Sequence, residues 1–367
     1  MSPWLPRSSS PRAARSRAIA TLLATCAVLA VSASAALAGP ANGGLPGASR
    51  SNPLAGMPWG HYTGTMDGVY PAWQNARGAR QRLLARIALR PLAYWFGSWF
   101  ADWYAPTAAR EYIASDTGGN PNALAQMAVF RLDKWEQAAC TDDPSRAAQA
   151  SYRRWVDNFA AGIGASRVAL ILQPDLPFAL CAPTRVPLQL VAYAAKTFSA
   201  LPHTTVYIDG GVHWFPMRSD QAVSMLEQAG VRYARGFALN TTEYDATGAE
   251  LEYGASIVRG LQAAGYGTKH MVINTAQNGA PFLNGQYHGN VGNPRVCANR
   301  HDAICATLGI PPTSDTASPH WGLTGAQRSI AARYADAYLW IGRPWLDYGS
   351  NPLDIARMLG LSASSPF

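Results

Sequence analysis

The side chains of this sequence that could do chemistry are carboxylates, amides and indoles that follow apolar segments. Val168–Leu172 is apolar throughout, and Asp175 comes three residues after it. A carboxyl group can transfer protons, amides can bind hydroxyl groups, and flat aromatic rings can pack on the C–H faces of sugars. An aspartate that caps the next helix fits the same position. The ends of the other apolar segments therefore decide how Asp175 is interpreted.

Seven apolar runs of strand length recur along the chain and alternate with helical patterns. The predicted strands are Leu92–Phe96, Met127–Leu132, Val168–Leu172, Thr205–Ile208, Tyr233–Leu239, His270–Ile273 and Ala337–Ile341. The predicted helices include Ser145–Ile163, Val186–Leu201, Ser219–Ala229, Ala249–Ala264 and Thr324–Ala335. This alternation predicts an α/β fold, a distorted, nearly closed parallel (β/α) barrel of about seven strands that resembles a TIM barrel. An open doubly wound sheet is the alternative, although no Gly-x-Gly-x-x-Gly motif follows the first strand.

Polar or aromatic residues follow every predicted strand. In chain order they are Trp99, Asp133–Glu136, Asp175, Asp209, Asn240, Asn274–Gln277 and Arg343–Asp347. In a barrel these positions lie on the C-terminal face, where catalytic side chains gather. The sequence has no Ser-His-Asp order, no His-Glu-x-x-His motif and no P-loop. Acids, amides and indoles on one face indicate a sugar-binding cleft.

Residues 1–38 have the pattern of a secretory signal peptide. Four arginines precede the apolar run Ala18–Leu29, which is too short to span a membrane, and Ala36-Leu37-Ala38 offers a cleavage site. Removal of the signal lowers the net charge from +8 to about +4, and no clustered basic tract suggests nucleic-acid binding. Residues 39–60 are rich in Gly, Pro, Ala and Asn and are predicted to be a flexible lead-in. Residues 61–367 are predicted to form one catalytic-type domain.

The cysteines that follow the signal indicate two disulfides in a secreted, extracellular protein. They are Cys140, Cys181, Cys297 and Cys305. Three pairings are open, and we expect Cys297–Cys305 as a local loop staple with Cys140–Cys181 across two strand ends. A zinc site made of all four cysteines is the alternative, but no pair has close Cys-x-x-Cys spacing. We expect no metal, no cofactor and a monomeric protein.

Seven sequence blocks occur in an order that resembles one known family. They are Pro-Leu-Ala-Tyr-Trp-Phe at 91–96, Ile-Leu-Gln-Pro-Asp at 171–175, Val-Tyr-Ile-Asp-Gly-Gly at 206–211, Arg-Gly-Phe-Ala-Leu-Asn at 235–240, Val-Ile-Asn-Thr-Ala-Gln-Asn-Gly at 272–279, Leu-Gly-Ile-Pro-Pro at 308–312 and Asp-Ala-Tyr-Leu-Trp at 336–340. Over residues 82–367 the chain resembles glycoside hydrolase family 6, the cellobiohydrolases and endoglucanases that invert β-1,4-glucosidic bonds. The resemblance implies a distorted barrel with the substrate along its C-terminal face.

The resemblance also implies roles for residues at the strand ends. Asp175 matches the family's general acid, and Trp95 matches the aromatic platform for a sugar on the non-reducing side. Asp209 matches an aspartate near the centre of the cleft. Asn240 matches an amide that lines the cleft, and Trp214 matches a platform beyond the scissile bond. Asn240 also begins an Asn-Thr-Thr glycosylation sequon, but its place at a strand end favours an internal hydrogen-bonding role over glycosylation.

Several positions near the acid depart from the family's pattern. Gln173 replaces a glutamate, which removes one neighbouring charge. Trp135 replaces an arginine and is a further platform candidate, and Gln277 replaces another arginine in the cleft. Glu136 replaces the family's second aspartate, and we expect its charge to tune Asp175. A glutamate at a helix start is the alternative for Glu136.

The segment after the last strand differs most from the family. Lys-Pro-x-Gly-Glu-Ser-Asp-Gly is replaced by Gly-Arg-Pro-Trp-Leu-Asp-Tyr-Gly at 342–349, so that the family's base falls on Tyr348. Asp347, one position away, is the best candidate for the base, with a surface turn or a water chain as alternatives. Arg343 is expected to hold Asp347 or to bind a sugar hydroxyl.

These observations predict a secreted, inverting hydrolase of β-1,4-glucan in which Asp175 is the acid. Its partner would be a β-glucan polysaccharide or oligosaccharide, with no nucleic acid and no membrane contact after signal cleavage. The alternative is a carbohydrate-binding protein that keeps the barrel and has lost effective catalysis, which the replaced segment at 342–349 favours.

Overall fold

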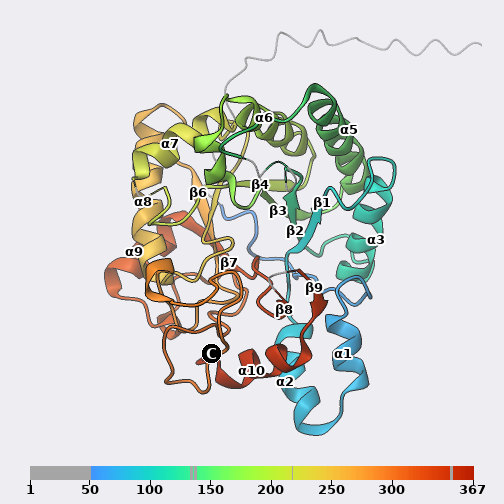
Figure 1. Ribbon diagram of the computed structural model, residues 1–367, viewed down its shortest axis with the longest axis vertical. Coiled ribbons are helices and arrows are strands. Elements are labelled where there is room, and N and C mark those ends of the chain that lie inside the picture. Colours follow the sequence, from blue (N-terminus) through green and yellow to red (C-terminus); the bar gives the residue numbers. More distant parts are fainter. Residues whose placement is uncertain (1–50, 133–134, 136–138, 217, 348–349) are drawn as a thin grey trace, which may run out of the picture. The chain divides into compact units, whose positions relative to one another are not determined.

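Seven parallel strands pair in chain order, from β1 to β7 (Figure 1). The computed structural model describes residues 51–132, 135, 139–216, 218–347 and 350–367. The strands are β1 Tyr94–Gly97, β2 Ala125–Phe130, β3 Val168–Leu172, β4 Thr204–Asp209, β5 Gly236–Leu239, β6 His270–Asn274 and β7 Ala335–Leu339. All seven predicted strands are present, and β3 has the predicted bounds. The predicted signal peptide, Glu136 and Tyr348 lie outside the described residues.

The sheet curls until its first and last strands approach each other. The backbone N–H of Ala93, just before β1, donates to the carbonyl of Trp340, just after β7, at 2.9 Å. The indole Nε1 of Trp95 in β1 donates to the carbonyl of Ile341 at 2.7 Å. These contacts confirm the predicted distorted, nearly closed barrel rather than an open sheet.

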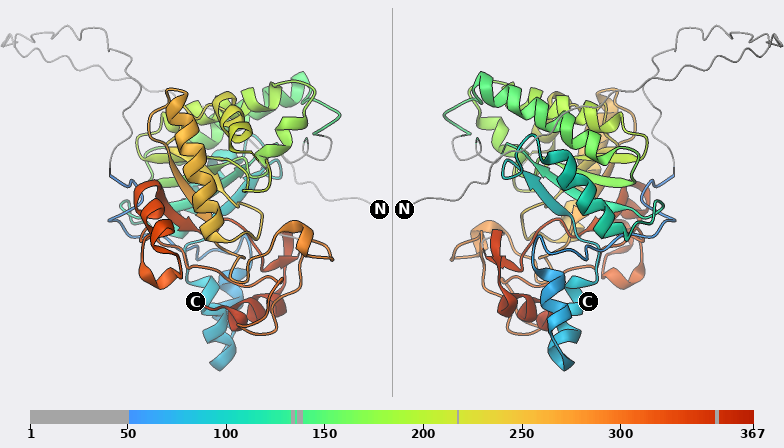
Figure 2. Two further views of the ribbon diagram at one scale, coloured as in Figure 1. Left: turned by 90° about the vertical axis from the view of Figure 1, so that its left-hand side faces the viewer. Right: turned by 90° about the vertical axis from the view of Figure 1, so that its right-hand side faces the viewer.

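Helices cover the outer face of the sheet (Figure 2). They are α3 Ala105–Thr117, α5 Arg146–Ile163, α6 Val186–Ser199, α7 Ser219–Gln228, α8 Thr247–Ala263 and α9 Gly325–Tyr334. In α5, the Ser145 hydroxyl accepts from the backbone N–H of Ala148 and caps the helix start. The same helix buries Tyr152, Trp155 and Phe159 against the sheet. Five of these six helices correspond to predicted ones, and α3 was not predicted.

A second group of elements packs beside the barrel and was also not predicted. It comprises α1 Val69–Asn75, α2 Gly78–Ala88, α10 Ile355–Ser364 and the antiparallel pair β8 Leu346–Asp347 and β9 Ser350–Leu353. Leu84, Trp345 and Leu361 belong to the apolar cluster that joins α2 and α10. Short 3₁₀ turns occur at η1 Leu176–Cys181, η2 Asn284–Gln286 and η3 Pro319–Trp321. In the described ranges, no helix has the length and apolarity needed to cross a membrane.

The strands are buried on both faces, as an apolar run without alternation predicts. In β3, Val168, Leu170 and Leu172 belong to the cluster shared with the outer helices. Ala169 and Ile171 belong to the cluster inside the barrel. Along a strand, one set of alternate residues therefore packs against the outer helices and the other set fills the interior. The polar residues that follow the strands lie in the loops beyond this core.

Part of the predicted flexible lead-in is folded onto the domain. Leu54 is fully buried, and the Asn52 amide donates to the carbonyl of Asp336 at 2.6 Å. Trp59 forms a parallel bridge with Leu124, just before β2. The prediction of a flexible segment is therefore wrong for residues 51–60, because an apolar and an aromatic side chain find partners in the barrel. The predicted disulfides, Cys140–Cys181 and Cys297–Cys305, are both present.

Candidate active site

A cleft runs across the C-terminal ends of the strands, with Asp175 at its middle. One cavity is lined by Asp175, Asp209 and Trp214, from the loops after β3 and β4 and the end of β4 itself. A second cavity extends towards Trp95 at β1. Asp175 and Thr242 line both cavities, so the two form one cleft that meets at this carboxyl group.

Asp175 is held in an unusual backbone conformation. Its φ angle is 63° and that of Gln173 is 55°, both in the left-handed region that is uncommon for residues other than glycine. The hydroxyl of Thr242 donates to Asp175 Oδ1 at 2.7 Å. Burial raises the pKa of the Asp175 carboxyl, and the hydrogen bond from Thr242 opposes that shift. A carboxyl group in this state can hold a proton to higher pH than a solvated aspartate.

Asp209 lies behind Asp175 and is only 1% exposed. Its carboxylate accepts from the backbone N–H groups of Leu176 and Gly211, each at 3.3 Å, and from the Thr241 hydroxyl at 3.2 Å. Burial raises the pKa of Asp209 to about 8, and the nearby charge of Asp175 adds to the shift. Because it binds the residue that follows Asp175, Asp209 is placed to fix the turn that carries the acid.

Sequence analysis did not single out two residues in the loop after β5. Thr242 contacts Asp175 as described, and Glu243 lines the cavity that holds Asp209 and Trp214. Burial raises the pKa of Glu243 to about 7, with a further contribution from the charge of Asp175. Both follow the predicted strand end by only a few residues. The signal that could have found them is the polar run after Asn240, which was considered only as a sequon.

The other half of the cleft brings together Trp95, Arg343 and Gln277. The guanidinium of Arg343 lies over the Trp95 ring, 4.4 Å from its centroid. Burial lowers the pKa of Arg343 to about 10, and the negative charge of Asp67 opposes that shift. Trp95 is 6% exposed, and the guanidinium of Arg343 covers one face of the indole that was expected to carry a sugar. The Gln277 side chain donates to the Thr242 carbonyl at 2.9 Å.

Two of the predicted substrate-binding residues lie away from this cleft. The Asn240 side chain is completely buried, donates to the carbonyls of Asp245 and Asn274, and accepts from the Asp245 N–H. Trp135 donates to the Asp142 carbonyl at 2.7 Å and lines a separate pocket.

Asp347, the predicted base, lies in the short strand β8 at the edge of the cleft. The Asn293 side-chain amide donates to Asp347 Oδ1 at 2.8 Å. Asn293 and Leu346, the neighbour of Asp347, line the same cavity as Asp175. Arg343, which was expected to hold Asp347 or to bind a sugar hydroxyl, lies over Trp95.

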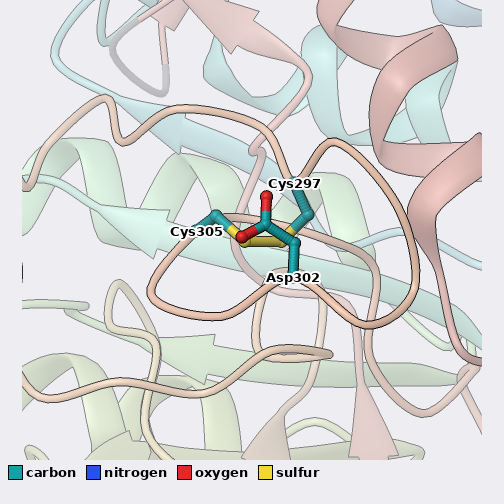
Figure 3. A group of neighbouring side chains, drawn as sticks. All are labelled: Cys297, Asp302 and Cys305. Atoms are coloured by element: carbon teal, nitrogen blue, oxygen red, sulfur yellow. A yellow bond between two sulfur atoms is a disulfide. The ribbon is translucent and has the colours of Figure 1, made fainter.

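Two groups of side chains among the described residues have the composition of a metal site. In the first, Figure 3 shows Cys297 and Cys305 joined by a disulfide, with the Asp302 carboxyl beside them. The disulfide removes both thiolates, and Asp302 accepts two hydrogen bonds from Arg295, so this group is not a metal site. The second group is His213, Asp245 and Glu250, whose donor atoms all lie within 4.8 Å of one another. His213 directly precedes Trp214 in the chain.

Comparison with known proteins identifies relatives over most of the chain. The family model described as glycosyl hydrolases family 6 matches residues 59–345. Endoglucanase A of Cellulomonas fimi is 34% identical over 240 residues, which are 64% of this chain and 49% of the relative. Endoglucanase 1 of Streptomyces halstedii is 30% identical over 210 residues, 55% of this chain and 63% of the relative. The matches thus span about half to two thirds of these relatives' lengths.

Solved structures share the fold. The endoglucanase Cel6 from Mycobacterium tuberculosis, in complex with methyl-cellobiosyl-4-deoxy-4-thio-β-D-cellobioside, superposes with a TM-score of 0.67 and 26% identity. That comparison covers 85% of this chain and 98% of the other. Cellobiohydrolase II (Cel6A) from Humicola insolens, at 19% identity, has a TM-score of 0.60 and covers 79% of this chain and 86% of the other. The chain belongs to glycosyl hydrolases family 6.

Proposed function

We propose that this protein is a secreted glycoside hydrolase that cleaves β-1,4-glucan with inversion, with Asp175 as the general acid. The observation that carries the proposal is a partly exposed carboxyl group at the middle of a cleft, with a pKa raised by burial. A protonated carboxyl in this position can give its proton to the glycosidic oxygen as the bond breaks. The names of the endoglucanase relatives and the cellobioside ligand of the Mycobacterium tuberculosis structure support a β-1,4-glucan substrate.

Two neighbours prepare the acid in this mechanism. The Thr242 hydroxyl occupies Asp175 Oδ1, which leaves Oδ2 to carry the proton. Asp209 holds the backbone N–H of Leu176 and thereby the direction of the preceding side chain. Asp175 is the catalytic residue here, and Thr242 and Asp209 are positioning residues.

Inversion also requires a water molecule to lose a proton on the opposite face of the sugar. The second carboxylate then stands ~6.5–9.5 Å from the acid, which leaves room for that water. We assign this task to Asp347, which Asn293 orients at the cleft edge. The tuning role of Glu136 also remains a proposal.

Trp214, Trp95, Gln277 and Arg343 are proposed to bind the glucan, because all four line the cleft. Secretion is supported by the signal pattern and by the two disulfides. A carbohydrate-binding protein with impaired catalysis is the second candidate function. The covering of the Trp95 face by Arg343 favours it, because a sugar must displace that guanidinium before it can stack.

Release of products from cellohexaose by the purified protein separates the two functions. We expect wild type to hydrolyse the substrate, and Asp175→Asn to lose nearly all activity while it retains binding. Asp347→Asn tests the base, and Asp220→Asn, at an exposed position on α7, is the matched control that should behave as wild type. If wild type binds cellohexaose but releases no products, the hydrolase is excluded and the carbohydrate-binding function is the one that stands. A β-anomer in fresh product, read by NMR, would exclude inversion.

A further inference from the structure

Three side chains from different segments meet beside the cleft. The Nδ1 atom of His213, after β4, lies 2.8 Å from Asp245 Oδ2 and 3.0 Å from Glu250 Oε1. Glu250 Oε1 also accepts from the backbone N–H of His213 at 3.0 Å. The donor atoms of the three residues all lie within 4.8 Å of one another.

The cluster contains more negative charge than its described partners balance. The side chains of Asp245 and Glu250 are 0% exposed, whereas that of His213 is 29% exposed. Within the described part of the chain, the ion-pair partner of both carboxylates is His213. One imidazolium can balance one carboxylate and leaves the second uncompensated in a buried place, which is costly.

Each carboxylate also has an oxygen without a hydrogen-bond partner. Among the described residues these are Glu250 Oε2 and both oxygens of Asp245, although Asp245 Oδ2 lies 2.8 Å from His213 Nδ1. Both side chains are fully buried. Buried oxygens of this kind are rare unless water, a proton or a cation satisfies them. Glu250 lies in the first turn of α8, where the helix dipole favours its charged form.

We propose that His213, Asp245 and Glu250 form a binding site for one divalent metal ion, with Zn²⁺ as the preferred cation. Imidazole nitrogen and carboxylate oxygen are both ordinary zinc ligands, and two carboxylates balance the charge of the ion. Ligands at 2.0–2.2 Å around a tetrahedral ion stand about 3.4 Å apart, so the two separations from His213 Nδ1 need to widen only by about half an ångström. His213 is the partly exposed member of the group, so we expect a water molecule to reach the ion from that side as the fourth ligand. The expectation of no metal rested on the spacing of the cysteines and on the lack of a His-Glu-x-x-His motif, and neither pattern includes these three residues.

The ion would connect three segments that form the cleft. His213 precedes Trp214, which lines the cavity with Asp175. The Asp245 backbone carbonyl accepts from Asn240 and Asn278, at the ends of β5 and β6. Glu250 belongs to α8. A metal at this position would therefore fix the loop that carries Trp214, independently of whether the protein hydrolyses glucan.

Metal content and affinity test the site on the full folded protein after dialysis against a chelator. We expect titration with ZnCl₂ to show one Zn²⁺ per chain, and saturating Zn²⁺ to raise Tm by about 5 °C. Glu250→Gln and His213→Gln should each weaken Zn²⁺ affinity by at least about 100-fold. Glu252→Gln, an exposed position two residues along the same helix, is the matched control and should bind as wild type.

The Co²⁺ form of wild type gives a readout that does not depend on the folding of a variant. We expect Co²⁺ to give the visible absorption of a four-coordinate site, and added Zn²⁺ to displace the Co²⁺ and remove that absorption. A folded wild type that takes up no stoichiometric Zn²⁺ would overturn the proposal and would indicate that a proton shared by the two carboxylates fills the cluster. Zn²⁺ affinity unchanged in both Glu250→Gln and His213→Gln would overturn it as well.

Discussion

The hydrogen bond from Thr242 to Asp175 can be removed with little change of shape by Thr242→Val. The bond is 2.7 Å long and favours the charged form of the acid. Its loss should therefore raise the pKa of Asp175. A hydrogen bond to a charged group contributes about 1.5–3 kcal/mol, and one pKa unit corresponds to about 1.36 kcal/mol. Thr242 is partly exposed, so the low end applies and the expected rise is about one unit.

A general acid works in its protonated form, so the higher pKa extends activity to higher pH. We expect the basic limb of the pH profile of kcat/KM on a chromogenic cello-oligosaccharide to move up by about one pH unit in Thr242→Val. Thr268→Val is the matched control, because the Thr268 hydroxyl accepts from the Gln262 side chain at the outer end of α8, away from the cleft. It should leave the position of the basic limb unchanged. A basic limb that stays where it is, or moves down, would refute the role of Thr242 and the assignment of Asp175 as the group that titrates there.

Two further predictions concern stability. Asp116 is 3% exposed, and burial raises its pKa to about 8, so the folded state binds a proton that the unfolded state releases near pH 4. The free energy of unfolding should therefore fall as pH rises from 5 to 9, and Asp116→Asn should remove up to about 4 kcal/mol of that fall. Urea unfolding at several pH values measures it. Plots of the free energy of unfolding against pH that run parallel for the two proteins would contradict the prediction. The two disulfides close loops of different length, with cysteines 41 residues apart for Cys140–Cys181 and 8 apart for Cys297–Cys305. Replacing both cysteines of a pair by serine should lower the free energy of unfolding by about 4 kcal/mol for the first pair and by about 2.5 kcal/mol for the second. Equal losses from the two pairs would show that loop length does not govern them.

The barrel could be predicted because its signal is local and repeated. An apolar run such as Val168–Leu172, between helical patterns, fits a strand of a parallel sheet with helices outside, and that run is β3. Helices α1, α2 and α10 were missed because they do not alternate with strands of the sheet. Their apolar faces pack on one another and on Trp345, a contact between distant segments that no local pattern contains.

The candidate site was predictable to the same extent. Asp175 and Asp209 follow strand ends, and parallel strands bring those ends together. Asn240 follows a strand end too, yet its φ of 60° turns its side chain into the barrel wall towards Asp245. The path of the loop after the strand thus decides which side chain enters the cleft, and here it is Thr242. Arg343 was expected to hold Asp347, which is near it in the chain, or to bind a sugar hydroxyl, and its guanidinium lies over Trp95 in the cleft.

Gln173 shows how an uncharged neighbour supports the turn that carries Asp175, the proposed acid. Its side-chain oxygen accepts from the N–H of Leu132 at 3.2 Å, and its backbone N–H donates to the carbonyl of Val129 at 2.7 Å, so the residue ties the β3 turn to β2. Left-handed residues such as Gln173 and Asp175 cost of order 1–3 kcal/mol each and persist only where the surroundings hold them. A glutamate at 173 could accept the same bond from Leu132, but it would place a second charge, 2% exposed, beside the acid. The amide keeps the hydrogen bond and omits that charge, so burial, rather than repulsion from residue 173, raises the pKa of Asp175.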